Sequence, residues 1–227
     1  SVNYSGPGCE PNADHPKPEE NTSRCFPVYW SPQGGTERQQ DWFHKYVVTD
    51  VYSADTTGGS DSIRTHYDYT DDGGREWAAW HHADDPISPP KWRTWNQWRG
   101  YSTVTTTVGD SANRPKSRTV SVFLRGMAGD KGKSKDLTVA GNTKVPGLRS
   151  PAITDRDALA GFLRENVTYD GNTPVSGAWY EPWTHETASY DYGEAQYVAR
   201  ASYVRTASEH SWTAVTRDRS LSAQWEH

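Results

Sequence analysis

Long aliphatic side chains are scarce in this sequence. Its 227 residues include only 29 Val, Ile, Leu and Phe together, and a single Met. So few aliphatic residues would usually indicate a disordered chain. The sequence nevertheless contains 11 Trp, 13 Tyr and 23 Thr, and disordered chains are poor in aromatic and β-branched residues. Because these residues fit the pleated, half-buried surface of a sheet, the composition excludes an all-helical protein or coiled coil and predicts a β-rich one.

Two further features are missing from the sequence. Lys and Arg are scattered, and the net charge is −5, so the basic face or tail that is typical of nucleic-acid-binding proteins is lacking. We therefore expect no nucleic-acid partner. No run of 18 apolar residues occurs, which argues against a membrane-spanning segment.

Cysteine is also rare. Cys9 and Cys25 lie in or next to a polar, Pro- and Gly-rich stretch, residues 1–24, that is expected to be an arm without packed structure. The pair could form a disulfide, or it could remain as two thiols in a mobile arm. Zinc is not expected, because no third and fourth ligand follow at zinc-finger spacing and His15 alone is not enough. No metal site or cofactor is therefore predicted.

The rest of the chain, 25–227, reads as one β-rich segment. Residues 63–69 alternate between two faces and are followed by Asp71-Asp72-Gly73-Gly74 and then by 76–80, which predicts a hairpin. Residues 101–108 and 119–124 predict a second strand pair around a polar turn at 109–116. Further strands are expected at 46–52, 166–169, 187–192, 197–206 and 212–217. At most one short helix is expected, near 156–166, where Gly161 weakens the helical pattern.

Tyr-Asp dipeptides recur near the ends of these expected strands, each with a glycine shortly after. The tyrosine is expected to pack on the sheet while the aspartate caps the turn through the backbone. The last two pairs are 21 residues apart, a spacing typical of repeat architectures. These positions are Tyr67 and Asp68 (with Gly73), Tyr169, Asp170 and Gly171, and Tyr190, Asp191 and Gly193.

Several longer strings occur together in a fixed order. They are RCFPVYW at 24–30, DWFHKYVVT at 41–49, TWNQWRGY at 94–101, RGMAGD at 125–130, DALAGF and RENVTYDG at 157–162 and 164–171, and PW with TA at 182–183 and 187–188. In this order and spacing the chain resembles the region ahead of, or opening, the YD-repeat array of large actinobacterial RHS-repeat proteins. The resemblance covers roughly residues 24–206.

The resemblance implies an all-β fold of antiparallel hairpins in an open or wrapped YD-repeat-type sheet. Proteins of this family are large, secreted or located at the bacterial cell surface. Their repeats form a shell around a toxic or effector domain, as in the cocoon of insecticidal toxin complexes. The resemblance therefore implies that this chain is a structural, non-catalytic segment. Its partners would be neighbouring YD repeats, the rest of a larger RHS chain, or the enclosed domain. The family's self-cleavage motif is not matched, because Asp84-Asp85-Pro86 lacks the Gly-Leu context.

The alternative to a shell segment is a secreted carbohydrate-binding β-module. Exposed aromatic rings on a sheet are the usual platform for sugar rings, and Trp92, Trp95 and Trp98 are the candidates. Packing of these rings in the core or the sheet wall is the favoured interpretation, because Trp is a large core residue where aliphatic residues are scarce.

A metal site or an active site is a weaker possibility. His81, His82, Asp84 and Asp85 carry metal-ligating groups, but adjacent residues of a strand point to opposite faces. Acidic turns at 71–74 and 126–130 do not follow a calcium-binding pattern. Glu181 is the best candidate for a glycosidase carboxylate, but no second carboxylate can be chosen. We expect no enzyme.

Overall fold

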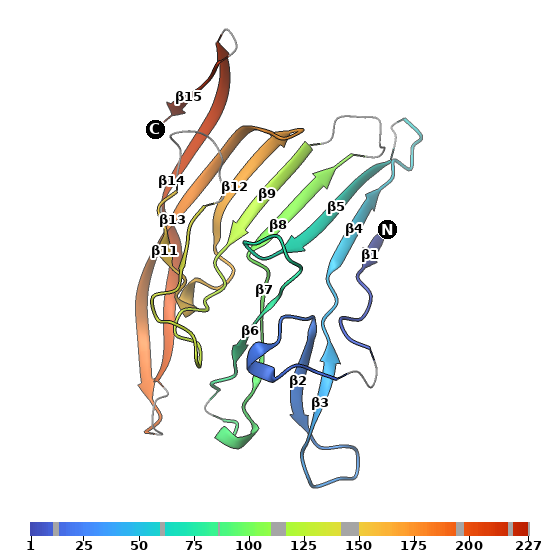
Figure 1. Ribbon diagram of the computed structural model, residues 1–227, viewed down its shortest axis with the longest axis vertical. Coiled ribbons are helices and arrows are strands. Elements are labelled where there is room, and N and C mark those ends of the chain that lie inside the picture. Colours follow the sequence, from blue (N-terminus) through green and yellow to red (C-terminus); the bar gives the residue numbers. More distant parts are fainter. Residues whose placement is uncertain are drawn as a thin grey trace.

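The chain is described here from a computed structural model that covers residues 1–10, 14–59, 62–85, 87–109, 117–141, 150–193, 198–217 and 220–226. Nine strands form one open antiparallel sheet in the order β1-β4-β5-β8-β9-β12-β13-β14-β15. They are β1 (Val2–Tyr4), β4 (Val48–Ser53), β5 (Ile63–Thr70), β8 (Thr103–Val108), β9 (Ser117–Phe123), β12 (Leu163–Asp170), β13 (Thr173–Asp191), β14 (Val198–Arg217) and β15 (Ser220–Glu226). The predicted all-β fold is confirmed (Figure 1).

Three two-stranded sheets accompany the large sheet. They pair β2 (Cys25–Trp30) with β3 (Gln39–His44), β6 (Ala79–His82) with β7 (Trp95–Gly100), and β10 (Thr138–Val139) with β11 (Ile153–Thr154). In Figure 1 the β2–β3 and β6–β7 pairs lie below the large sheet. Within the described residues, helical structure is limited to three short 3-10 helices: η1 (Pro18–Glu20), η2 (Pro90–Trp92) and η3 (Asp157–Leu159).

The predicted hairpin between 63–69 and 76–80 is wrong. β5 pairs with β4 and β8 instead, and residues 79–82 form β6 with β7 as its partner. The turn closes on itself, because the Asp71 carboxylate accepts the backbone N–H groups of Gly73 and Arg75. The chain then turns away from the large sheet, where Trp80 donates its indole N–H to the Ser23 carbonyl. The predicted pairing of 101–108 with 119–124 is confirmed as β8 with β9.

The expected helix near 156–166 is reduced to the single turn η3, and β12 begins at Leu163. Gly161, at φ +83°, ends the turn in the left-handed region, which a continuing helix cannot contain. The expectation of an unpacked arm is wrong for Val2–Tyr4, which forms β1 and pairs with β4. Three earlier expectations lie partly outside the described residues: the turn at 110–116, Pro86, and position 197 of the strand at 197–206.

Aromatic side chains provide much of the packing. Val167, Tyr169, Trp179 and Trp212 form the buried cluster of the large sheet. A second series of rings joins the small sheets to the large one, with centroid distances of 4.7, 4.8, 5.7 and 5.2 Å. It runs from Phe26 through Trp80, Trp98 and Tyr101 to Tyr69. Rings therefore perform the packing that aliphatic residues perform in most cores.

Candidate functional site

The Tyr-Asp pairs lie on strands, but their environments differ. Tyr169 is buried at the end of β12, and the Arg118 guanidinium lies 4.5 Å from its ring centroid. Asp170 and Gly171 follow in the turn to β13, where Gly171 has φ +58°. Tyr169 therefore packs on the sheet as expected for this position.

The other two pairs behave differently from each other. Asp191, at the end of β13, accepts the backbone N–H of Gly193 at 2.8 Å, so it caps its turn as expected, while Tyr190 is 63% exposed. Tyr67 and Asp68 lie inside β5, and the Asp68 carboxylate lies 3.2 Å from His66 Nε2 instead of capping a turn. The three pairs thus share a place near strand ends but not one structural role.

A charged group links β4 to β5. Asp50 lies directly opposite His66, and its Oδ1 is 2.8 Å from His66 Nδ1 and 2.7 Å from Arg64 Nε. The hydrogen bond from His66, together with the bond and charge of Arg64, lowers the pKa of Asp50 against the opposing effect of burial. The same bond to Asp50, with the nearby Asp68, raises the pKa of His66 above 6.5 although partial burial opposes it. This group fixes the sheet register by charge.

The three candidate sugar-binding tryptophans do not form one platform. Trp92 lies on η2 and packs on Tyr29, with ring centroids 5.3 Å apart. Trp95 and Trp98 lie on β7, where a shift in register between them places both opposite β6, Trp95 against His82 with ring centroids 4.7 Å apart and Trp98 against Trp80. Trp98 packs edge-on against Trp80 in the aromatic series described above. All three are half-buried.

The histidine and aspartate residues at 81–85 are close in sequence but do not converge on one point in the structure. His82 Nδ1 lies 2.6 Å from Asp84, and the Asp85 carboxylate accepts the backbone N–H of Ser88. His81 is buried; its Nδ1 lies 2.8 Å from the His82 carbonyl and its Nε2 3.5 Å from Asp130. Because His82 and Asp84 contact each other while His81 and Asp85 have other partners, the four do not surround a common ion.

Glu181 belongs to the β13–β14 ladder. Its carboxylate accepts the hydroxyl of Ser208 at 3.0 Å and lies 3.5 Å from His210 Nε2. These are partners on the neighbouring strand, so Glu181 makes cross-strand polar contacts within the sheet.

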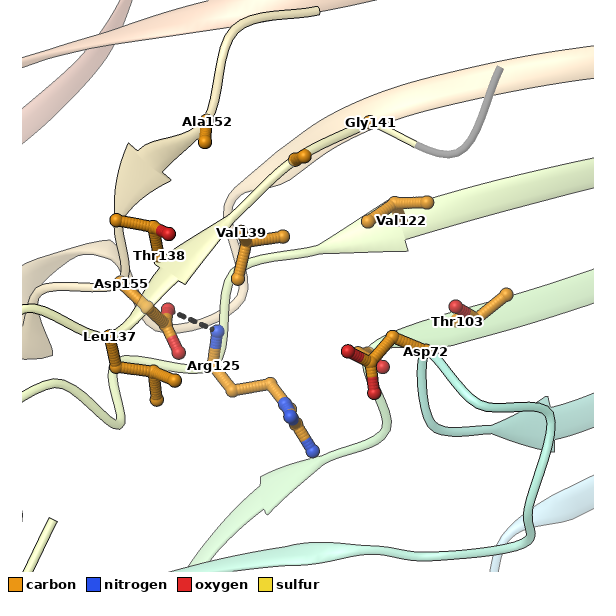
Figure 2. Close-up of a pocket in the computed structure, with 12 residues that line it drawn as sticks. Asp72, Thr103, Val122, Arg125, Leu137, Thr138, Val139, Gly141, Ala152 and Asp155 are labelled. Carbon is orange, nitrogen blue, oxygen red and sulfur yellow. Dashed lines mark hydrogen bonds between the residues drawn. The ribbon is translucent and has the colours of Figure 1, made fainter. Parts of the chain in front are cut away.

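A cavity of about 350 Å³ opens between the large sheet and the β10–β11 segment (Figure 2). Asp155 at its base is fully buried, and its carboxylate accepts the backbone N–H groups of Arg125, Gly126 and Met127 at 2.8, 2.7 and 3.0 Å. Figure 2 shows the Arg125 side chain extending into the cavity on the side of Asp72. Asp155 thereby holds the backbone from which this side chain extends. Sequence reasoning missed Asp155, because its partners lie 28 to 30 positions earlier and no local pattern marks it.

A largely exposed feature is the β13–β14 ribbon, which we define as residues 182–191 of β13 and 198–206 of β14. These segments pair with each other, and among the described residues neither has another strand partner. Trp183, Tyr190 and Tyr203 are 47%, 63% and 61% exposed. Trp183 pairs with Arg205 and Tyr190 with Ala199, and positions 199, 203 and 205 of one strand share a face. The three rings therefore lie on one face, which we call the aromatic face.

The other face of the ribbon is polar. Arg200 donates to the Glu186 carboxylate at 2.5 Å on that face. Near the base of the ribbon, Pro182 and Thr184 line a cavity of about 340 Å³ together with Thr154 and Leu159 of the β11–η3 segment. The ribbon thus carries its large exposed rings on one face, while the other face is polar and is partly covered at its base.

No helix in the described parts of the chain is long and apolar enough to cross a membrane. Comparison of the chain with protein-family models, with curated proteins and with solved structures finds no match. The resemblance to RHS/YD-repeat proteins therefore remains a prediction from the sequence.

Proposed function

We propose that the chain is a structural, non-catalytic segment of a secreted or surface-located bacterial RHS/YD-repeat protein. In this role it contributes to a β-shell that encloses or presents a toxin or effector domain. The observation that carries the proposal is the uncovered β13–β14 ribbon of the open sheet. Neighbouring YD repeats would be its partners.

The ribbon lacks the additional contacts that stabilise a pair of strands. A two-stranded ribbon on its own is marginally stable in water, and it gains stability from a third strand or from packing against another element. The ribbon extends beyond the pairing of β12 with β13, which ends at Trp179. Its aromatic face carries three large exposed rings. Exposed large rings gathered on one face of a ribbon are a candidate interaction surface.

The sheet edges support the same proposal. β1 and β15 are the outermost strands of the large sheet, and a strand at an edge presents backbone N–H and C=O groups that another strand can pair with. A sheet that follows the chain almost in sequence order can be extended by further hairpins at the β15 edge. This is how a repeat array grows. The carbohydrate-binding alternative lacks comparable support, because Trp92, Trp95 and Trp98 are each half-buried and packed against another ring.

The proposal is tested by sedimentation velocity of the 227-residue chain over a series of concentrations, with a second copy standing in for neighbouring repeats. We expect concentration-dependent association, and we expect the double variant Trp183→Ser, Tyr203→Ser to weaken it. Arg200→Ser on the polar face is the matched control and should leave association unchanged. A chain that stays monomeric at every concentration, or that responds equally to both variants, would contradict the proposal.

A further inference from the structure

Cys9, Cys25 and His44 lie close together where the N-terminal arm meets the β2–β3 pair. The structure joins Cys9 to Cys25 in a disulfide, which decides between the two alternatives left open by the sequence. The ring of His44 lies against both sulfurs, with Nδ1 3.5 Å from Cys9 Sγ and 3.7 Å from Cys25 Sγ. In the described parts of the chain this is the one group of three metal-ligating side chains whose donor atoms lie within 4.8 Å of one another.

Strand pairing places the three donors together. Cys25, the first residue of β2, lies directly opposite His44, the last residue of β3. Directly opposite residues of an antiparallel pair project their side chains to the same face, with Cβ atoms about 4.5–5.5 Å apart. Cys9 is then brought to this face by the arm. The third ligand that the sequence lacked is thus supplied from 19 positions beyond Cys25.

We infer that Cys9, Cys25 and His44 form a zinc site when the disulfide is reduced. Thiolate and imidazole are ligands that Zn²⁺ prefers. Bond lengths of about 2.3 Å to sulfur and about 2.0–2.1 Å to nitrogen at a tetrahedral ion place the two kinds of donor about 3.6 Å apart. The sulfur–nitrogen distances of 3.5 and 3.7 Å already match this value. Only the two sulfurs must separate, to about 3.8 Å.

The remaining coordination position is open. Cys25 is fully buried, whereas His44 is exposed, so the ion would be held at the surface with one side toward solvent. Three protein ligands with a fourth position taken by water or another small donor are typical of accessible zinc sites.

The exchange between the two states balances. A phosphine reductant breaks the sulfur–sulfur bond and becomes the phosphine oxide with oxygen from water, while both sulfurs become thiols. Zn²⁺ then replaces the two thiol protons, which are released to solvent. In the reverse direction an oxidant of the thiol–disulfide class re-forms the disulfide and sets the ion free. The site is therefore gated by the redox state of the same two sulfurs.

The test uses the full 227-residue chain after reduction with a phosphine, with Co²⁺ as a spectroscopic probe and Zn²⁺ in calorimetric titrations. We expect one ion per reduced chain, thiolate-to-cobalt charge-transfer absorption, two protons released per Zn²⁺, and no such binding by the oxidised chain. His44→Ala should weaken affinity by more than the ~10–100-fold that loss of an outer-shell partner costs.

His15→Ala is the matched control, because His15 belongs to the same arm but stacks on Trp42, with ring centroids 4.3 Å apart. It should leave the affinity unchanged. Far-UV circular dichroism of each reduced protein establishes whether the sheet persists, and His44→Gln gives a second variant of similar size. The inference is overturned if the reduced chain binds no more metal than the oxidised one, or if the His44 and His15 variants bind equally well.

Discussion

Replacing Asp155 should destabilise the protein far more than the removal of one charge from its surface. The carboxylate is fully buried and accepts three backbone N–H groups, from Arg125, Gly126 and Met127. Those donors belong to a loop that leaves β9 and passes under the cavity, and a buried N–H without a partner is strongly unfavourable. Asp155 is therefore the acceptor on which the loop depends.

The expected magnitude follows from the number of donors. In Asp155→Ala all three N–H groups lose their acceptor, at about 1–3 kcal/mol each, so we expect about 4–6 kcal/mol after partial relaxation. In Asp155→Asn one oxygen is retained and can still serve Arg125 and Gly126, while the new amide N–H₂ faces the N–H of Met127. The loss of one charge-assisted bond then costs about 2–3 kcal/mol.

Urea unfolding followed by far-UV circular dichroism measures both values. Asp136→Asn is the control, since it removes an exposed carboxylate from the same region and should change the free energy of unfolding by less than about 0.5 kcal/mol. If Asp155→Asn and Asp136→Asn have the same effect, the loop does not depend on the buried carboxylate and the reasoning is refuted.

Two other predictions concern the large sheet. The bond to Asp50 raises the pKa of His66 above 6.5 in the folded state. The stabilisation that this bond gives the fold is therefore complete below pH 6.5 and is lost as pH rises through the raised pKa. His66→Gln should remove this part of the pH dependence of the free energy of unfolding in urea, and an unchanged pH slope would contradict the prediction. A Cβ at Gly177 would lie 2.6 Å from the Asn166 carbonyl oxygen, so Gly177→Ala should lower the free energy of unfolding by about 1–3 kcal/mol. Gly6→Ala, where a Cβ meets nothing within 4 Å, is the control, and equal thermal melting of the two variants would show that the strands can yield.

The fold class could be predicted because it depends on composition and alternation, which are local properties. The β8–β9 pair was found for the same reason, since two Thr- and Val-rich strands flank one polar turn. The hairpin at 63–80 was mispredicted because the sequence of a turn does not say whether the chain continues along the sheet. In the structure the Asp71 carboxylate accepts hydrogen bonds from Arg75 within the turn, and the chain leaves the sheet there.

Local sequence patterns also do not predict how long a strand is. β13 runs from Thr173 to Asp191, yet Pro182 interrupts it as a sequence signal. In the structure Pro182 lies at a shift in register between β13 and β14, which is where proline is tolerated in a sheet. Of the candidate metal donors, His44 could not be recognised from spacing, because only the register of β2 with β3 places it opposite Cys25.

The Cys9–Cys25 disulfide shortens the path along the chain between β1 and β4, two strands that contain neither cysteine. β1 ends at Tyr4 and pairs there with Val48, 44 positions later. The pairing of Cys25 with His44 alone joins the same two residues by a path of about 25 residues, and the Cys9–Cys25 bond shortens that path to about ten. Shortening the loop about 2.5-fold lowers the entropy cost of closing it by about 0.8 kcal/mol. A three-residue edge strand is thereby held near its site, so the redox state of two sulfurs also controls how often the β4 edge of the sheet is uncovered.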